Sequence, residues 1–363
     1  MIACQREKSG NHVGVPAVAR RGLCGTTRSP DAPIVRTFAA QEGVYVLGYA
    51  NQAMTIGTTS FVAGDSYLAR VASTGGVVDI AVRVTDQPAA LVSTGLGKFS
   101  FAAGSKVYAC VDGATAISCT QQADIGSGAV IGLLATATNG SIMLAGNFSG
   151  AHAFGPINLT APATGDIFIA NYSNGVKFAT QLGVQGTALI SSLVTTPTSS
   201  LYVAGRFSGA IGVGAETTTS KGMEDVFLGR FDFTDTTVTQ AWIDGFGAAG
   251  SSAYGRVLGI GQAGGPLLEA DISGQEPFVG VDFGGGALAR GIALASFQPD
   301  GTHVWSRGVS IYGNAALGPG GAIMVAGSYL QNSDDYAGKA AFGGADLPVK
   351  GGEDSVFAVL SPP

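Results

Sequence analysis

One hairpin-like segment returns along the chain and limits what the chain can fold into. Each copy has an apolar run, a turn of Gly, Ser, Thr or Pro, and a second β-rich run that ends in a small residue followed by Gly or Asp. This pattern predicts a β-hairpin, and its return every several dozen residues indicates a repeat architecture. The clearest copies are Leu189–Gly205, Ala129–Gly146, Ala315–Gly327 and Pro33–Gly48, and two weaker ones are Ala90–Gly104 and Arg256–Asp271.

The sequence around each hairpin predicts an all-β chain, a β-propeller of about six four-stranded antiparallel blades. After the hairpin, a unit continues with a Phe-Gly or Ile-Gly loop, a strand opened by Asp, a turn and a last strand. The final unit lacks its last strand, whereas the N-terminal segment has β-type sequence without a partner. We therefore expect strands from both termini to close the ring. The predicted organisation is one propeller domain over residues 31–363 after an irregular segment over residues 1–30.

The composition fits short strands and argues against several classes of protein. The 363 residues include 57 glycines, and 12% are charged, about half the share of typical soluble domains. Many glycines with few Lys and Glu disfavour helices. A net charge of −6 provides no basic stripe for a phosphate backbone, so we expect no nucleic acid partner. There is no apolar run of about 18 residues, so no membrane-spanning helix is predicted.

The four cysteines bear on whether the protein resides in an oxidising compartment and whether it carries a lipid anchor. Cys110 and Cys119 bracket a turn-rich segment, VDGATAIS, so they can face each other across a hairpin. In an oxidising compartment they are expected to form a disulfide; the alternative is two buried thiols. Ile2-Ala3-Cys4 resembles the end of a bacterial lipoprotein signal, whose Cys carries the lipid anchor, but the apolar segment that should precede it is absent. The alternative for this end is a frayed terminus.

Several repeated motifs resemble those of a known group of proteins. Val203–Gly209 (VAGRFSG) and Leu144–Gly150 (LAGNFSG) are accompanied by Phe-Gly loops, Asp-to-Phe strand openings and a late Trp. This combination is similar to the bacterial secreted β-propeller repeat proteins that are abundant in myxobacteria, over roughly residues 33–363. The resemblance implies an extracytoplasmic propeller that is secreted or attached to the outer membrane or cell surface. It implies no particular activity, because propellers serve many functions.

One aspartate opens the same strand in four of the units. Three of these residues stand two positions before an aromatic residue, and the fourth stands three before one. A ring of such carboxylates could bind a cation such as calcium. The alternative, which we favour, is a structural role in which each side chain caps the turn that starts its strand. The four residues are Asp65, Asp166, Asp225 and Asp354.

The remaining motifs do not indicate an enzyme. None of the three histidines stands at a metal-ligand spacing from another, and neither a nucleophile elbow nor a phosphate loop is present. Trp242 and Trp305 occupy equivalent late positions in two units, which suggests core packing. We therefore expect no catalytic residues and no cofactor, and a scaffold that binds a protein or polysaccharide at the cell surface. The alternative is a polysaccharide lyase or glycoside hydrolase with its site at the channel mouth, for which the faint candidates are Tyr329, Asp334, Asp335 and Tyr336.

Overall fold

The structure is a computed structural model of the chain, and the fold it shows is all-β. It describes residues 34–361, except 41–42, 73–77, 85–86, 114–115, 163–164, 215, 276–277, 310, 331–338, 341–346 and 349–352. Six antiparallel sheets make up the blades of a six-bladed β-propeller, as the repeat predicted. The closing strand expected from the N-terminus falls in residues 1–33, outside the described residues. In the described part of the chain, no helix is long and apolar enough to cross a membrane.

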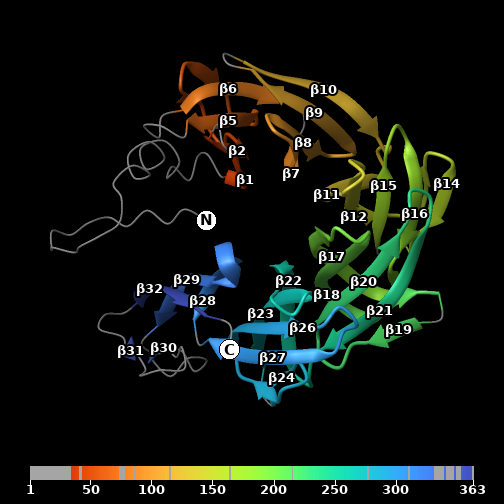
Figure 1. The fold of residues 1–363 in the computed structure, drawn as a ribbon, viewed down its shortest axis with the longest axis vertical. Coiled ribbons are helices and arrows are strands. Elements are labelled where there is room, and N and C mark those ends of the chain that lie inside the picture. The colour runs from red at the N-terminus through yellow and green to blue at the C-terminus, as the bar shows by residue number, and fades with distance from the viewer. Residues whose placement is uncertain are drawn as a thin grey trace. The chain divides into compact units, whose positions relative to one another are not determined.

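The chain divides into two compact units, and unit 1, Met1–Thr136, holds the first two sheets. Figure 1 shows the strands of the second sheet as neighbours in orange and gold. The order of the first sheet is β1 (Ile34–Ala40), β2 (Gly43–Tyr49), β5 (Ser66–Ala72) and β6 (Val78–Val84). The order of the second is β10 (Ile117–Asp124), β9 (Lys106–Asp112), β8 (Lys98–Ala103) and β7 (Pro88–Gly95), and the unit ends with β11 (Ala129–Thr136).

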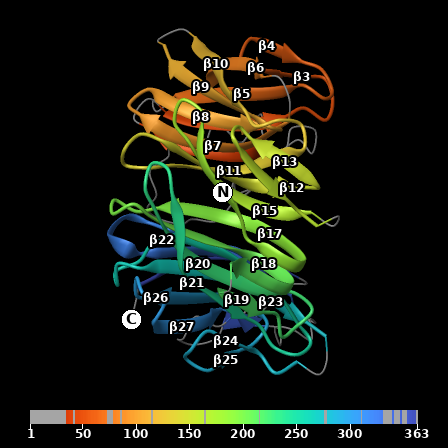
Figure 2. The same ribbon diagram turned by 90° about the vertical axis from the view of Figure 1, so that its right-hand side faces the viewer.

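Unit 2, Ala137–Pro363, holds the strands of the remaining sheets. The third sheet contributes β12 (Ile142–Phe148), β15 (Asp166–Tyr172) and β16 (Val176–Gln181). The fourth has the order β17 (Gly183–Thr195), β18 (Ser200–Val213), β20 (Asp225–Phe233) and β21 (Val238–Phe246), which Figure 2 shows side by side in green to teal. The fifth has the order β22 (Ser251–Ile260), β23 (Pro266–Gly274), β26 (Gly291–Phe297) and β27 (His303–Val309). The sixth has the order β28 (Tyr312–Leu317), β29 (Ile323–Leu330) and β32 (Glu353–Leu360), with a 3-10 turn at Pro319–Gly321.

A second, shorter hairpin follows the second strand of most sheets, where the sequence has its Phe-Gly or Ile-Gly loop. Its turn starts with a glycine at positive φ in three copies: Gly57 (60°), Gly155 (61°) and Gly214 (68°). This left-handed conformation favours glycine because it has no Cβ. The paired strands are β3 (Met54–Ile56) with β4 (Thr59–Phe61), β13 (Ala151–Phe154) with β14 (Ile157–Thr160), β24 (Val281–Asp282) with β25 (Ala287–Leu288), β30 (Lys339–Ala340) with β31 (Leu347–Pro348), and the end of β18 with β19 (Glu216–Thr219).

Within each unit, consecutive sheets pack around buried aromatic and aliphatic side chains. In unit 1, Tyr45 of the first sheet shares a cluster with Phe99 of the second. In unit 2, Tyr202 and Phe297 belong to a cluster that joins the fourth and fifth sheets. The middle strands are covered on both faces, and all seven residues of β26 are buried. This explains why these strands appear in the sequence as continuous apolar runs.

A recurring hydrogen bond also ties consecutive sheets together. In three sheets a polar side chain on the third strand donates to a backbone carbonyl in the turn between the third and fourth strands of the next sheet. Arg70 Nη1 donates to Gly113 O (3.4 Å), Asn171 Nδ2 to Asp235 O (3.5 Å) and Arg230 Nη1 to Pro299 O (3.0 Å). Arg70 also pairs with the buried carboxylate of Asp112 in that turn region. We call this contact the inter-sheet bond.

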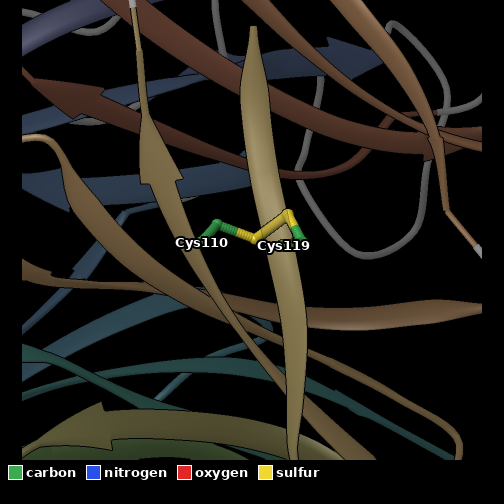
Figure 3. Close-up of a disulfide and its surroundings, with 2 residues drawn as sticks. All are labelled: Cys110 and Cys119. Atoms are coloured by element: carbon green, nitrogen blue, oxygen red, sulfur yellow. A yellow bond between two sulfur atoms is a disulfide. The ribbon is translucent and has the colours of Figure 1, made fainter.

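The disulfide predicted from the sequence is present in the second sheet. Cys110 of β9 and Cys119 of β10 lie directly opposite each other in the strand register and are bonded, with their Cα atoms 4.1 Å apart (Figure 3). Because the bond closes a loop of nine residues' separation, it restricts the unfolded chain more than the folded one. Cys4 and Cys24 lie outside the described residues.

Removal of this disulfide is expected to destabilise unit 1. The double substitution Cys110→Ser with Cys119→Ser should lower the free energy of unfolding by about 2–3 kcal/mol, the chain-entropy value for a loop of this size. The measurement is urea unfolding of both proteins with and without reductant. Reductant should shift the midpoint of the wild type only, and an equal shift in both proteins would contradict the assignment.

Candidate functional site

Two of the four candidate aspartates bind the backbone of their own turns. The Asp225 carboxylate, fully buried, accepts the N–H groups of Lys221 (2.6 Å) and Gly222 (2.9 Å). The Asp65 carboxylate accepts Val62 N–H (2.8 Å) and pairs with Arg83 Nε (2.9 Å). These contacts are those of turn caps. They occupy both oxygens of Asp225 and Oδ2 of Asp65.

Asp166 differs from the other two because one of its oxygens is buried without a hydrogen-bond partner among the described residues. Its Oδ1 accepts the N–H groups of Ile167 and Gly183, each at 2.6 Å. Its Oδ2 is buried and has no hydrogen-bond partner among the described residues. Burial therefore raises the pKa of this carboxyl to about 6, against the opposing effect of the two N–H donors. Half-satisfied carboxylates favour the protonated form.

The other residues proposed for a site cannot be placed together. The side chain of Asp354 and residues Asp334, Asp335 and Tyr336 lie outside the described part of the structure, as does the side chain of Tyr329. Among the described residues, no group of three or more His, Cys, Asp or Glu side chains could hold a metal ion. The structure thus brings no two of the four aspartates into one site within its described part.

Two glycines that complete the aspartate caps were missed in the sequence. A Cβ on Gly183 would lie 2.0 Å from Asp166 Oδ1, and one on Gly247 would lie 1.9 Å from Asp225 Cγ. Gly247 directly follows β21, and Gly183 stands two residues after the end of β16, as the first residue of β17. Each lies next to the aspartate that opens the third strand of its sheet. The sequence signal was available, since TQLG and DGFG occur at equivalent places in the two units.

In the fourth sheet, Trp242 is covered by a turn of the fifth sheet. Tyr202, Arg230 and Trp242 lie opposite one another on its second, third and fourth strands, and the Tyr202 and Trp242 rings are 6.2 Å apart. Trp242 Nε1 donates to Pro299 O at 3.0 Å, the same carbonyl that accepts from Arg230. The turn of the fifth sheet therefore closes over Trp242.

The equivalent row of the fifth sheet leaves a cleft. Here Leu267, Ser296 and Trp305 stand opposite one another, so a leucine replaces the tyrosine and a serine replaces the arginine. Both replacements are shorter, and a cleft of about 250 Å³ lies beside the half-buried Trp305. Its principal lining side chains are Gln262, Leu267, Ser296, Trp305, Leu317 and Ile323.

The cleft suits a small, largely apolar group with one or two hydrogen-bond acceptors. Leu267, Leu317 and Ile323 supply apolar walls. Neither the Ser296 hydroxyl nor the Trp305 indole N–H makes a hydrogen bond to any residue that the structure describes, and both are donors. Its volume is below the roughly 300–1,000 Å³ of pockets that bury a drug-sized ligand. It therefore has room for one ring or one side chain.

The fifth sheet also differs from the fourth in the residues of β27 that lie under the hairpin of β24 and β25. A bulge at Val304 places His303 and Ser306 on one face of β27. His303 Nε2 and Ser306 Oγ are both buried without a partner among the described residues, and a Cβ on Gly285 would lie within 3.1 Å of each. In the fourth sheet the position of His303 is taken by Gln240, which bonds Val213 N (2.8 Å) and Glu216 O (3.0 Å).

Comparison with known proteins gives structural similarity only. No family model matches the chain, and no curated protein matches it. Among solved structures, a luciferin-regenerating enzyme is similar at a TM-score of 0.43 and 9% identity, over 84% of this chain and 86% of that one. An acylaminoacyl peptidase of Pyrococcus horikoshii has a TM-score of 0.46 and 10% identity, over 90% of this chain and 47% of its own. The extracellular domain of a putative one component system from B. thetaiotaomicron has a TM-score of 0.39 and 11% identity, over 92% and 46%.

This chain spans about half the length of the peptidase and of the B. thetaiotaomicron protein. At TM-scores below 0.5, these similarities carry no information about the activity of this chain.

The single unsatisfied oxygen of Asp166 predicts a pH-dependent stability. Because the folded-state pKa, about 6, lies above the ordinary value of 3.8, this carboxyl stabilises the fold fully below pH 4, and that contribution is lost as the pH rises through 6. Asp166→Asn removes the titration. Between pH 4 and pH 7.5 the stability of the variant relative to the wild type should rise by about 2–3 kcal/mol, measured by urea unfolding across that range; a constant difference would contradict the analysis.

Asp225→Asn is the matched substitution at a cap whose two oxygens are both used. An amide keeps one acceptor and leaves either Lys221 N–H or Gly222 N–H without a partner. The variant should therefore lose about 1–3 kcal/mol at pH 7, whereas Asp166→Asn should be tolerated at that pH. Equal losses in the two variants would show that the carboxylates play the same role.

Ser306→Ala should leave stability unchanged or raise it by up to about 1 kcal/mol, because it removes a buried hydroxyl without a partner. The equivalent residue is already alanine in two other sheets, Ala81 and Ala179. Ser251→Ala is the control, since the Ser251 hydroxyl bonds both N–H and C=O of Ala248 and its loss should cost about 1–2 kcal/mol. A clear loss in Ser306→Ala, measured by thermal unfolding, would mean that its hydroxyl has a bound partner.

Proposed function

We propose that this protein is a non-catalytic binding scaffold that acts outside the cytoplasm, and that its ligand enters the cleft beside Trp305. The observation that carries the proposal is the break in the repeat at that cleft. The fourth sheet fills the corresponding space with Tyr202 and Arg230, whereas the fifth has Leu267 and Ser296. A residue that stabilises the repeated unit is expected to recur from unit to unit. A binding site is expected where the residues of one unit depart from that repeat.

The state of the acidic groups supports binding rather than catalysis. General acid–base catalysis needs carboxyl groups that face a substrate. Both oxygens of Asp225, and one oxygen each of Asp65 and Glu269, are instead held by backbone N–H groups or arginines. Glu269, for example, accepts from both Arg256 (2.8 Å) and Ala315 N–H (3.0 Å). These carboxylates have a structural role.

Three features support a location outside the cytoplasm. The Cys110–Cys119 disulfide is consistent with an oxidising compartment. Ile2-Ala3-Cys4 resembles a lipoprotein cleavage site, at which Cys4 would carry a lipid anchor. The repeated motifs resemble those of secreted bacterial β-propeller repeat proteins. We infer a secreted or surface-attached protein whose ligand is a protein or a polysaccharide.

The test is to close the cleft with the residues that close it in the fourth sheet. The double substitution Leu267→Tyr with Ser296→Arg should keep the fold and abolish ligand binding, because it copies a packing that the protein already uses. Binding of the purified wild type and of this variant to glycan and peptide arrays is the measurement, with EDTA included to detect a cation requirement. Ligands bound equally by both proteins would contradict the proposed site.

A further inference from the structure

The sequence contains two Asn-Gly steps, Asn139-Gly140 and Asn174-Gly175. Such a step can modify itself, because the backbone nitrogen of the glycine can attack the side-chain amide of the asparagine before it, and no Cβ hinders the approach. Both steps lie in turns between strands, the first between β11 and β12 and the second between β15 and β16. The two turns differ in whether the reacting groups are held by other residues.

In the first turn, both reacting groups are held by hydrogen bonds. The Gly140 N–H donates to Ala137 O at 2.9 Å. The Asn139 side chain donates through Nδ2 to Asp235 Oδ1 (2.6 Å), and its Oδ1 accepts from the N–H (3.0 Å) and the hydroxyl (2.7 Å) of Ser141. An attack by the Gly140 nitrogen on Asn139 Cγ would have to break several of these bonds, each of which stabilises the unreacted turn.

In the second turn, neither reacting group is held by a residue that the structure describes. Asn174 is exposed, has a φ of 52°, and makes no side-chain hydrogen bond to any described residue. The Gly175 N–H makes none to these residues either, because the hydrogen bond of this turn runs from Ser173 N–H to Gly175 O (3.0 Å). A Cβ built on Gly175 would meet no atom within 4 Å. The nitrogen and the amide can therefore approach each other without displacing a neighbour.

We propose that Asn174 is a site of spontaneous deamidation, which converts it to aspartate and isoaspartate in the folded protein. The Gly175 nitrogen forms a bond to Asn174 Cγ, the Cγ–Nδ2 bond breaks, and the amide leaves as ammonia with the proton of the Gly175 N–H. Water then opens the cyclic imide. Cleavage of the bond between the Gly175 nitrogen and Cγ gives aspartate, whereas cleavage of its bond to the backbone carbonyl carbon gives isoaspartate. No oxidant or reductant is needed.

Both products change the turn between β15 and β16. Each adds a negative charge to a chain whose formal net charge is −6, and isoaspartate also adds one carbon to the backbone, which then runs through Cγ. Because Asn174 is exposed and the space beside Gly175 is open, the fold accommodates both products. The protein therefore accumulates a more acidic folded form with time, without an enzyme. This inference does not depend on the cleft beside Trp305.

The experiment incubates the full chain at mildly alkaline pH, both folded and in denaturing urea. Peptide mass mapping then follows the two asparagines, with a fragmentation method that distinguishes aspartate from isoaspartate. In the folded protein Asn174 should react at least about tenfold faster than Asn139, because the hydrogen bonds around Asn139 must break first. In urea these bonds are absent, so the two rates should become similar. Asn174→Gly is the matched variant, since glycine adopts a positive φ without strain, and it should abolish the acidic form produced at this turn.

Three results would overturn the inference. The first is conversion of the two asparagines at equal rates in the folded protein, and the second is conversion of Asn174 only in urea. The third is an acidic form that accumulates equally in the wild type and in the Asn174→Gly variant, which would place the modification elsewhere. Thermal unfolding of the wild type, before and after incubation, and of the variant establishes that the folded state is the one that reacts.

Discussion

The inter-sheet bond is the interaction on which the packing of consecutive sheets depends. Hydrophobic clusters hold the sheets together, but apolar contacts are not directional and would allow neighbouring sheets to slide. A side chain that donates to one carbonyl of the next turn fixes the register between the two sheets. Arg70, Asn171 and Arg230 do this with different side chains, so the geometry is maintained although the residue type changes.

The fifth sheet has a serine at the position from which the fourth makes this bond. Ser296 is too short to repeat the bond made by Arg230, and the cleft beside Trp305 results from that substitution together with Leu267. On its opposite side the same sheet has His303 in place of Gln240, and a hairpin turn that packs on it through glycines. Both departures replace a large, fully bonded polar residue by one with unused hydrogen-bonding capacity. A duplicated module can acquire a binding surface in this way without any change in its backbone plan.

The repeat pattern was sufficient to predict the all-β class, the blade count and the Cys110–Cys119 disulfide. These follow from local signals: turn residues, strand composition and the spacing of two cysteines across a hairpin. The site could not be predicted in the same way. The match with Trp242 predicts core packing for Trp305, and Trp305 does pack against the core cluster of the fifth and sixth sheets. Only the strand register shows that the residues beside it, Leu267 and Ser296, are smaller. The Asp–Gly contacts were missed for a similar reason, since Asp166 and Gly183 belong to different strands and meet only in the folded sheet.

The Asp–Gly contact has a consequence for how such a chain can diverge. A Cβ on Gly183 or Gly247 would overlap the carboxylate of its aspartate, so neither glycine can gain a side chain without loss of stability while that aspartate remains. The fifth unit has replaced both: Gly291 stands where four of the other units have Asp, and in the sequence Ser310 takes the place of Gly183 and Gly247. An aspartate and its glycine would therefore be replaced together. Among blades that descend from one ancestral module, the covariation of these two positions would record which blades were copied from which.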